Sequence, residues 1–192
     1  MAGAGRGYPA PGATITRVVR ETVGYVALGS NVGDRRANLA LGLAGMVERS
    51  LAPTRRSSIW ASEPVGASTP EWFLNMVVQI RSSKSALEVL DGLLDIERAA
   101  GRIRTAVRNA PRTLDLDLLT LGDATVASER LTLPHPRMWQ RRFVLAPLAE
   151  IDPDLVNPGT GKTVLQSLRE LGDTFEVRRL PGAVAAPDSG PL

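Results

Sequence analysis

The sequence predicts an α+β domain in which helices pack on one face of an antiparallel sheet. Two observations predict this class. Apolar runs typical of strands and of amphipathic helices follow one another in the order strand, helix, strand, strand, helix, strand, which is the split βαβ order of a ferredoxin-like core. A chain of 192 residues with 43% hydrophobic and 22% charged residues also suits one domain with a substantial core.

The first half of this core is predicted from apolar runs and the turn residues between them. The segment 22–31, TVGYVALGSN, is typical of a short buried strand that ends in a turn. Asp34 offers an N-cap to a helix that continues to about Ser50. Segments 54–62 and 73–82 are then expected as the second and third strands, joined by a loop rich in proline and glycine.

The second half begins with a helix and ends with a strand. Ser85 followed by Glu88 is a capping-box pattern, and Gly101 is expected to end the helix that follows. The stretch 111–122, PRTLDLDLLTLG, is the fourth expected strand. The remaining expected features are a helical face with Leu87, Leu90, Leu94 and Glu97, a polar hairpin region at 122–133, and a last helix near 163–171.

The ends of the chain differ in composition from the middle. Residues 1–21 are rich in glycine, alanine and proline and are expected to form a flexible leader without a secretory apolar segment. Residues 22–180 are the expected domain, and 181–192 an expected disordered tail. Cysteine is absent, which excludes disulfides and thiolate metal sites, and no run is apolar enough for a membrane span. A cytoplasmic location is therefore expected.

Two acids interrupt the apolar pattern of the fourth strand. Leucines alternate with Asp115 and Asp117, so the leucines share one face of the strand and the two carboxylates share the other. Aspartate is depleted in strands, and like charges on one face repel. Side chains two residues apart lie roughly 6.5–7 Å apart along a strand, so both carboxylates can converge on one cation or a pair of cations. The pattern predicts a metal site.

Arginine is concentrated around these acids. Residues 102–142 hold eight arginines and four acidic residues, a local charge of +4, whereas the whole chain carries +3. Four of these arginines lie in the polar loop 101–112, GRIRTAVRNAPR. Guanidinium groups bind phosphate oxygens in a bidentate manner, and paired metals with arginines are typical of phosphoryl-transfer sites. The combination predicts phosphoryl transfer.

His135 and a few aromatic residues are further candidates. A lone histidine is more often a structural hydrogen-bonding group, and phenylalanine is more often a core residue. Arg130, Thr132 and Arg141 lie near His135 in the sequence, however, and all could contact phosphate. Two phenylalanine rings around Asn75, which offers both a donor and an acceptor, would form a slot for a flat heterocycle.

Several of these motifs resemble the 6-hydroxymethyl-7,8-dihydropterin pyrophosphokinase family in order and near spacing. The resemblance covers roughly residues 23–172, and its most specific part is PRTLDLDLL together with LTLPHP. It implies a three-layer α-β-α sandwich around the ferredoxin-like core. It also implies a folate-biosynthesis enzyme that transfers diphosphate from ATP to the hydroxymethyl group of the reduced pterin and releases AMP. The matching stretches are ALGSN (27–31), SEPVG (62–66), FLN (73–75), GRIR (101–104), PRTLDLDLL (111–119), LTLPHPRM (131–138) and RRFVLAPLAEIDP (141–153).

The resemblance implies four groups of site residues. The ligands of two magnesium ions are Asp115 and Asp117, which with Arg102 and Arg112 form the catalytic group. The implied ATP contacts are Glu97, Arg104, Arg112, Arg130, Thr132, His135 and Arg141. The implied pterin contacts are Ser62, Pro64, Val65, Phe73, Asn75 and Phe143. The chain departs from many members at Asn109, where they have tryptophan, and from some members at Leu94, where they have glutamine.

Three other functions remain open at this point. A two-metal nucleotidyltransferase would release pyrophosphate instead of AMP. A nucleic-acid-binding module would explain the basic segment, but the strands lack interleaved exposed aromatics. A ligand-binding regulatory domain would not need both acids on one face. We expect small-molecule partners, ATP and the pterin, with other folate-pathway enzymes as candidate protein partners, a monomeric state, and no nucleic acid or membrane partner.

Overall fold

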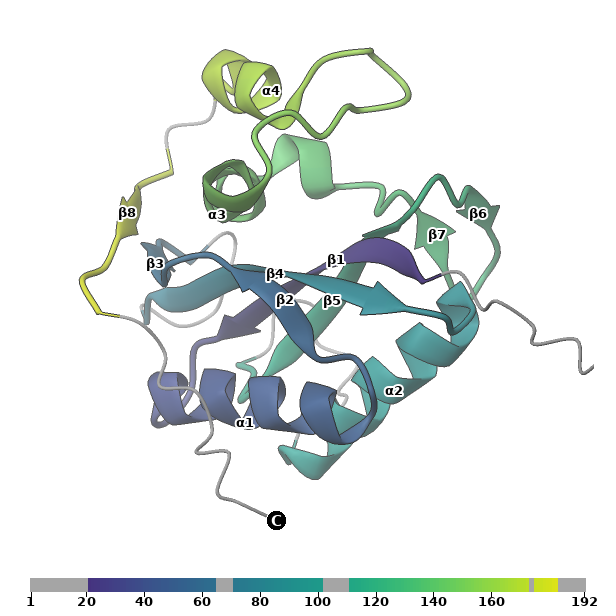
Figure 1. Ribbon diagram of the computed structural model, residues 1–192. Helices are drawn as coiled ribbons and strands as arrows, with labels where there is room; N and C mark the ends of the chain where they lie inside the picture. Colours follow the sequence, from purple (N-terminus) through teal and green to yellow (C-terminus); the bar gives the residue numbers. More distant parts are fainter. Residues whose placement is uncertain (1–20, 65–70, 102–110, 173–174, 183–192) are drawn as a thin grey trace, which may run out of the picture.

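The computed structural model is an antiparallel sheet between two layers of helices (Figure 1). The structure describes residues 21–64, 71–101, 111–172 and 175–182. No helix within these ranges is long and apolar enough to cross a membrane. The elements in chain order are β1 (Thr22–Ser30), α1 (Arg35–Glu48), β2 (Pro53–Arg56), β3 (Trp60–Ser62), β4 (Phe73–Ser82), α2 (Ala86–Ala99), β5 (Asp115–Leu121), β6 (Val126–Ala127), β7 (Thr132–Leu133), η1 (Met138–Gln140), α3 (Arg142–Ile151), α4 (Val164–Glu170) and β8 (Val177–Arg179).

The strand order confirms the predicted ferredoxin-like topology. The main sheet runs β5-β1-β4-β3-β8, with β2 also paired to β4, and every neighbouring pair is antiparallel. The central strands β1 and β4 pair along their full length, from Thr22 opposite Ser82 to Ser30 opposite Leu74. The site strand β5 therefore lies at one edge of the sheet, beside β1.

Helices α1 and α2 cover one face of the sheet, and α3 covers the other, as Figure 1 shows. The predicted caps form: Asp34 accepts the Ala37 N–H at 3.0 Å, and Ser85 and Glu88 form a complete capping box. The core under α1 and α2 is built on side chains such as Leu39 and Leu43, both fully buried. The three-layer α-β-α arrangement is confirmed.

Two sequence-based boundaries and one predicted helix face were wrong. Segment 54–62 is two strands, because the Ser57 hydroxyl accepts the Val77 N–H at 3.0 Å and interrupts the ladder between β2 and β3. The last core strand begins at Asp115, not at residue 111. The buried face of α2 is Val89, Leu93, Ile96 and Glu97, whereas Leu87 is 42% exposed and Leu90 and Leu94 are half-buried.

Helix α3, strand β8 and the short helix η1 were not predicted. Helix α3 contains Pro147, which cannot donate a backbone hydrogen bond and disfavours a helix in sequence reasoning. Strand β8 is only three residues long, and its pairing partner is the distant strand β3. The predicted hairpin and last helix are present as β6–β7 and α4. The predicted leader, apart from residue 21, and the predicted tail beyond residue 182 lie outside the described residues.

Candidate active site

Strand β5 borders a cavity of about 770 Å³. Leu116 and Leu118 are buried in the core under α1 and α2, and they border the cavity together with Asp115 and Asp117. Asp115 lies opposite Gly29 on β1, and Gly29 in turn lies opposite Asn75 on β4. A Cβ at position 29 would lie 3.5 Å from the Asn75 Oδ1 and 3.9 Å from the Asp115 Cβ. The glycine keeps the space between these two side chains open.

Cationic and imidazole groups surround the two acids. Arg112 forms an ion pair with Asp115. The Asp117 Oδ2 lies 3.8 Å from an Arg141 guanidinium nitrogen and 3.9 Å from the His135 Nε2. Burial and the negative charge of Asp115 raise the pKa of Asp117, although the three neighbouring groups partly offset this. Two acids under mutual repulsion beside a polar cavity are suited to a cation.

His135 is held in a defined orientation. Its backbone N–H donates to the Leu119 carbonyl at 2.8 Å, and its Nδ1 accepts the Arg137 N–H at 3.3 Å. Burial, and to a lesser degree Arg141 and Arg137, lower its pKa, and Asp117 opposes this shift. A neutral ring that accepts at Nδ1 carries its proton on Nε2, which faces Asp117.

Asn31, which the sequence analysis did not single out, positions Arg112. Its side-chain Oδ1 accepts the Arg112 N–H at 2.7 Å, and its own N–H donates to the Arg112 carbonyl at 3.1 Å. Asn31 is 1% exposed and follows β1 directly. Asn31 ends the ALGSN stretch, but nothing in the sequence pairs it with Arg112, which is 81 residues away.

A polar slot lies on the β4 side of the cavity. The Asn75 amide donates to the Ser62 hydroxyl at 2.9 Å, and both residues are buried. Phe73 and Phe143 line the same cavity, from β4 and from the first turn of α3. These residues from separate sequence motifs therefore line one cavity. Pro64 is described but is not among the lining residues, and Val65 lies outside the described residues.

The residues expected at the nucleotide lie on the β5 side. Glu97, 2% exposed, accepts the Leu116 N–H at 2.7 Å and so also fixes β5 against α2. Arg130, at the rim, forms an ion pair with Asp91. Thr132 and Leu94 also line the cavity, whereas Arg102, Arg104 and Asn109 lie outside the described residues. Lining residues that the sequence analysis did not assign to a site include Gly29, Glu63, Arg137, Gln140, Arg142, Phe175 and Val177.

The residues of the cavity suit a magnesium ion that is bound partly by substrate phosphates better than a metal ion bound by protein ligands alone. Within the described ranges no cluster of three or more histidine, cysteine or acidic residues forms a metal cage. Magnesium is usually held by one or two carboxylates together with substrate phosphates. Asp115 and Asp117, with arginines beside them for phosphate, meet that requirement.

An α-β-α sandwich with paired acids and arginines around one cavity defines a phosphoryl-transfer enzyme. The model of the 7,8-dihydro-6-hydroxymethylpterin-pyrophosphokinase (HPPK) family matches residues 25–153, and the chain belongs to this family. A Bacillus subtilis protein named 2-amino-4-hydroxy-6-hydroxymethyldihydropteridine pyrophosphokinase is 45% identical over 67% of this chain and 77% of its own length. A Synechocystis protein of the same name is 41% identical over 83% of this chain and 90% of its own.

Solved structures show the same fold in longer proteins. A Plasmodium falciparum HPPK-DHPS structure has a TM-score of 0.62 with 12% sequence identity, over 78% of this chain. The match spans only 44% of that structure's chain. A bifunctional folate synthesis protein of Arabidopsis thaliana is likewise 39% identical over 26% of its length. Some relatives therefore carry additional domains.

Proposed function

We propose that the cavity on β5 is where this chain transfers diphosphate from ATP to the hydroxymethyl group of 6-hydroxymethyl-7,8-dihydropterin and releases AMP. Family membership makes the chain a folate-biosynthesis pyrophosphokinase that acts on hydroxymethyldihydropterin. The proposal concerns which residues carry out the reaction. One observation carries it: Asp115 and Asp117 line the same cavity as the slot of Asn75 and Ser62.

The two ends of the cavity suit the two substrates. We assign the pterin to the slot, where the Asn75 amide and Ser62 hydroxyl can bind the polar edge of the ring and Phe73 and Phe143 its faces. ATP then lies toward Arg130, Thr132, His135 and Arg141. Arg112, Asp115 and Asp117 lie between the ends, where the transferred group would pass.

In the reaction a bond forms between the pterin hydroxyl oxygen and the β-phosphorus, and the bond from that phosphorus to the α,β-bridging oxygen breaks. The bridging oxygen leaves with AMP, and the hydroxyl proton is released. Arg112 and Arg141 would stabilise charge on the transferred diphosphate and the leaving group. His135, with its Nε2 proton facing Asp117, is placed to donate a hydrogen bond and not to accept a proton. Mg²⁺ held by Asp115 and Asp117 would neutralise phosphate charge and orient the oxygens.

Arg102 and Arg104 are proposed to complete the phosphate contacts on the basis of the family resemblance alone. Pro64 and Val65 are proposed on the same basis to contact the pterin. A cytoplasmic location and a monomeric state remain expectations from the sequence. The relatives that carry more than one domain make other folate-pathway enzymes candidate partners.

Product analysis tests the proposed reaction. The protein is mixed with ATP, Mg²⁺ and the pterin, and a control omits the pterin. We expect AMP and a diphosphorylated pterin only when the pterin is present. Release of pyrophosphate would instead indicate a nucleotidyltransferase, and ATP binding without AMP formation would favour a regulatory role.

A further inference from the structure

A C-terminal arm, which we define as Phe175–Leu180, reaches the cavity from outside the span that the family model matches. That span ends at residue 153. Phe175 and Val177 nevertheless line the cavity, together with residues of β4 and β5. Phe175 is 40% exposed, so part of its ring is left free to contact a ligand in the cavity that it lines. The arm therefore contributes an apolar wall to the site.

The register places this wall at the slot, not at the nucleotide end. In the pairing of β3 with β8, Val177 lies opposite Ser62, whose hydroxyl accepts the Asn75 amide. Just beyond, the Glu63 N–H donates to the Glu176 carbonyl, and the Glu176 N–H donates to the Glu63 carboxylate, both at 3.1 Å. Phe175 is the next residue along the arm. It is thus positioned beside the outer end of the slot.

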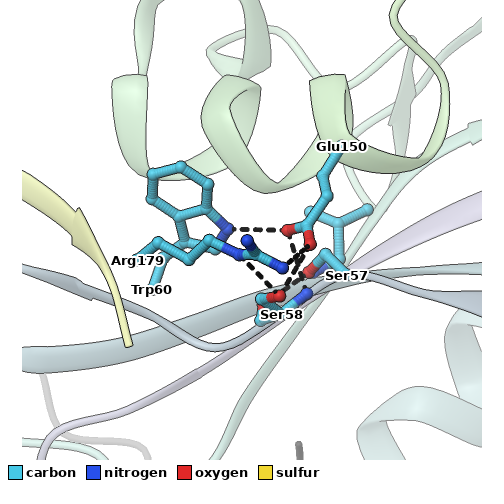
Figure 2. A network of polar contacts seen from close by, with 6 residues as sticks. Ser57, Ser58, Trp60, Glu150 and Arg179 are labelled. Carbon is cyan, nitrogen blue, oxygen red and sulfur yellow. Dashed lines mark hydrogen bonds and ion pairs between the residues drawn. The ribbon is translucent and has the colours of Figure 1, made fainter. Parts of the chain in front are cut away.

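The arm is fastened by a charged network drawn in Figure 2. The Arg179 guanidinium lies 3.0 Å from a carboxylate oxygen of Glu150 on α3 and donates to the Ser58 hydroxyl at 2.8 Å. Glu150 also accepts the Ser58 hydroxyl at 2.6 Å and the Trp60 indole N–H at 3.1 Å. The network joins β8, α3 and the segment that carries β3. Strand β3 ends at Ser62, which forms one side of the slot. The network therefore fixes the arm to this strand.

A second contact fixes the arm to the other side of the slot. The Arg178 guanidinium lies over the Trp72 ring, 4.6 Å from its centroid. Trp72 directly precedes Phe73, and its carbonyl accepts a hydrogen bond from Arg35 at 2.6 Å. Movement of the arm would therefore be transmitted to both strands that bound the slot.

We propose that Phe175 is a specificity-determining residue that covers the outer end of the pterin slot, and that Glu150 is a positioning residue that acts through the arm. This inference rests on the assignment of the pterin to the slot. Pterin binding then depends on the C-terminal arm, which lies beyond the residues that the family model matches, whereas nucleotide binding does not depend on the arm.

Direct binding measurements test the role of Phe175. Pterin affinity is measured with a non-hydrolysable ATP analogue present, and the affinity for the analogue is measured separately. Phe175→Ala should weaken pterin binding about 3- to 10-fold, as expected for loss of one aromatic contact, and leave analogue binding within about twofold. Phe175→Leu should weaken pterin binding less than Phe175→Ala does. The control is Leu41→Ala, which changes a 56% exposed leucine on α1 and should alter neither affinity.

A double-mutant cycle tests the role of Glu150. Glu150→Gln should weaken pterin binding about two- to threefold in the wild-type chain and cause no further loss when Phe175 is already alanine. Glu170→Gln, which breaks the ion pair between Glu170 at the end of α4 and Lys162 before the helix, is the matched control and should have no effect. Equal losses from Glu150→Gln in both backgrounds would overturn the proposed route through the arm.

The slot itself is checked with Asn75→Ala. If this variant loses pterin binding while Phe175→Ala binds pterin as well as Leu41→Ala does, the arm has no role in recognition and the inference is wrong. If Asn75→Ala binds pterin normally, the slot assignment is wrong and the inference falls with it.

Discussion

Replacing Asn31 with alanine removes a partly buried hydrogen bond that holds Arg112 in the active site. The Arg112 N–H loses its acceptor at 2.7 Å, while the reciprocal bond from the residue 31 N–H to the Arg112 carbonyl can remain. Loss of a partly buried hydrogen bond costs about 0.5–1.5 kcal/mol. At about 2–4 °C per kcal/mol for a domain of this size, a loss of about 1 kcal/mol lowers the Tm by about 2–4 °C. Arg112 also gains positional freedom beside Asp115, so we expect kcat to fall about tenfold, equivalent to about 1.4 kcal/mol of activation free energy.

Thermal unfolding and steady-state kinetics at saturating substrates measure these two effects. Asn38→Ala, in the first turn of α1, is a matched control, because its amide donates to the Ser30 hydroxyl at 3.1 Å and to the Val32 carbonyl at 2.8 Å, on either side of Asn31. It should lower the Tm by a similar amount with little change in kcat. An equal loss of kcat in both variants, or an unchanged kcat in Asn31→Ala, would refute the reasoning about Arg112.

Three further predictions concern substrate assignment, pH and packing. Asn75→Ala should weaken pterin binding about 10- to 100-fold and leave ATP binding unchanged, whereas Arg141→Ala should weaken ATP binding and leave pterin binding unchanged. Calorimetry measures both affinities, and a variant that loses affinity for both substrates would contradict the assignment. Burial raises the pKa of Glu150, but hydrogen bonds from Ser58 and Trp60 and the charge of Arg179 outweigh it, so the pKa lies below its usual value. The stabilisation that wild type gains over Glu150→Gln should therefore be constant above about pH 4.5 and be lost as the pH falls through the lowered pKa, which denaturant unfolding at several pH values can test. Gly24→Ala should lower the free energy of unfolding by about 1–3 kcal/mol, because a Cβ at this position would lie 2.9 Å from the Thr120 carbonyl oxygen. An unchanged Tm would show that the strands adjust to the added methyl group.

The core of the fold was predictable because local signals and tertiary structure agree there. The Asp34 cap and the Ser85–Glu88 box both form as the sequence indicated. Helix α3 and strand β8 were missed for different physical reasons. Pro147 contradicts a helix locally and is tolerated inside a helix packed against the sheet, while β8 exists through its pairing with β3.

The site was predictable to the extent that its residues break local patterns. Asp115 and Asp117 stand out because strands seldom carry adjacent acids on one face. Asn31 and Phe175 gave no such signal, since each acquires its place from a partner or surface far away in the chain. Glu97 was expected at the nucleotide, and the structure adds a bond to β5 that sequence reasoning could not supply.

The central claim is that Asp115 and Asp117 together form the reaction centre. The most direct test measures AMP formation by wild type, Asp115→Asn and Asp117→Asn over a range of Mg²⁺ concentrations, with ATP and the pterin present and folding checked by circular dichroism. We predict that each folded variant loses at least about 10³-fold in rate, roughly 4 kcal/mol, and that its remaining activity responds weakly to Mg²⁺. A folded Asp117→Asn variant within about tenfold of the wild-type rate would contradict the claim.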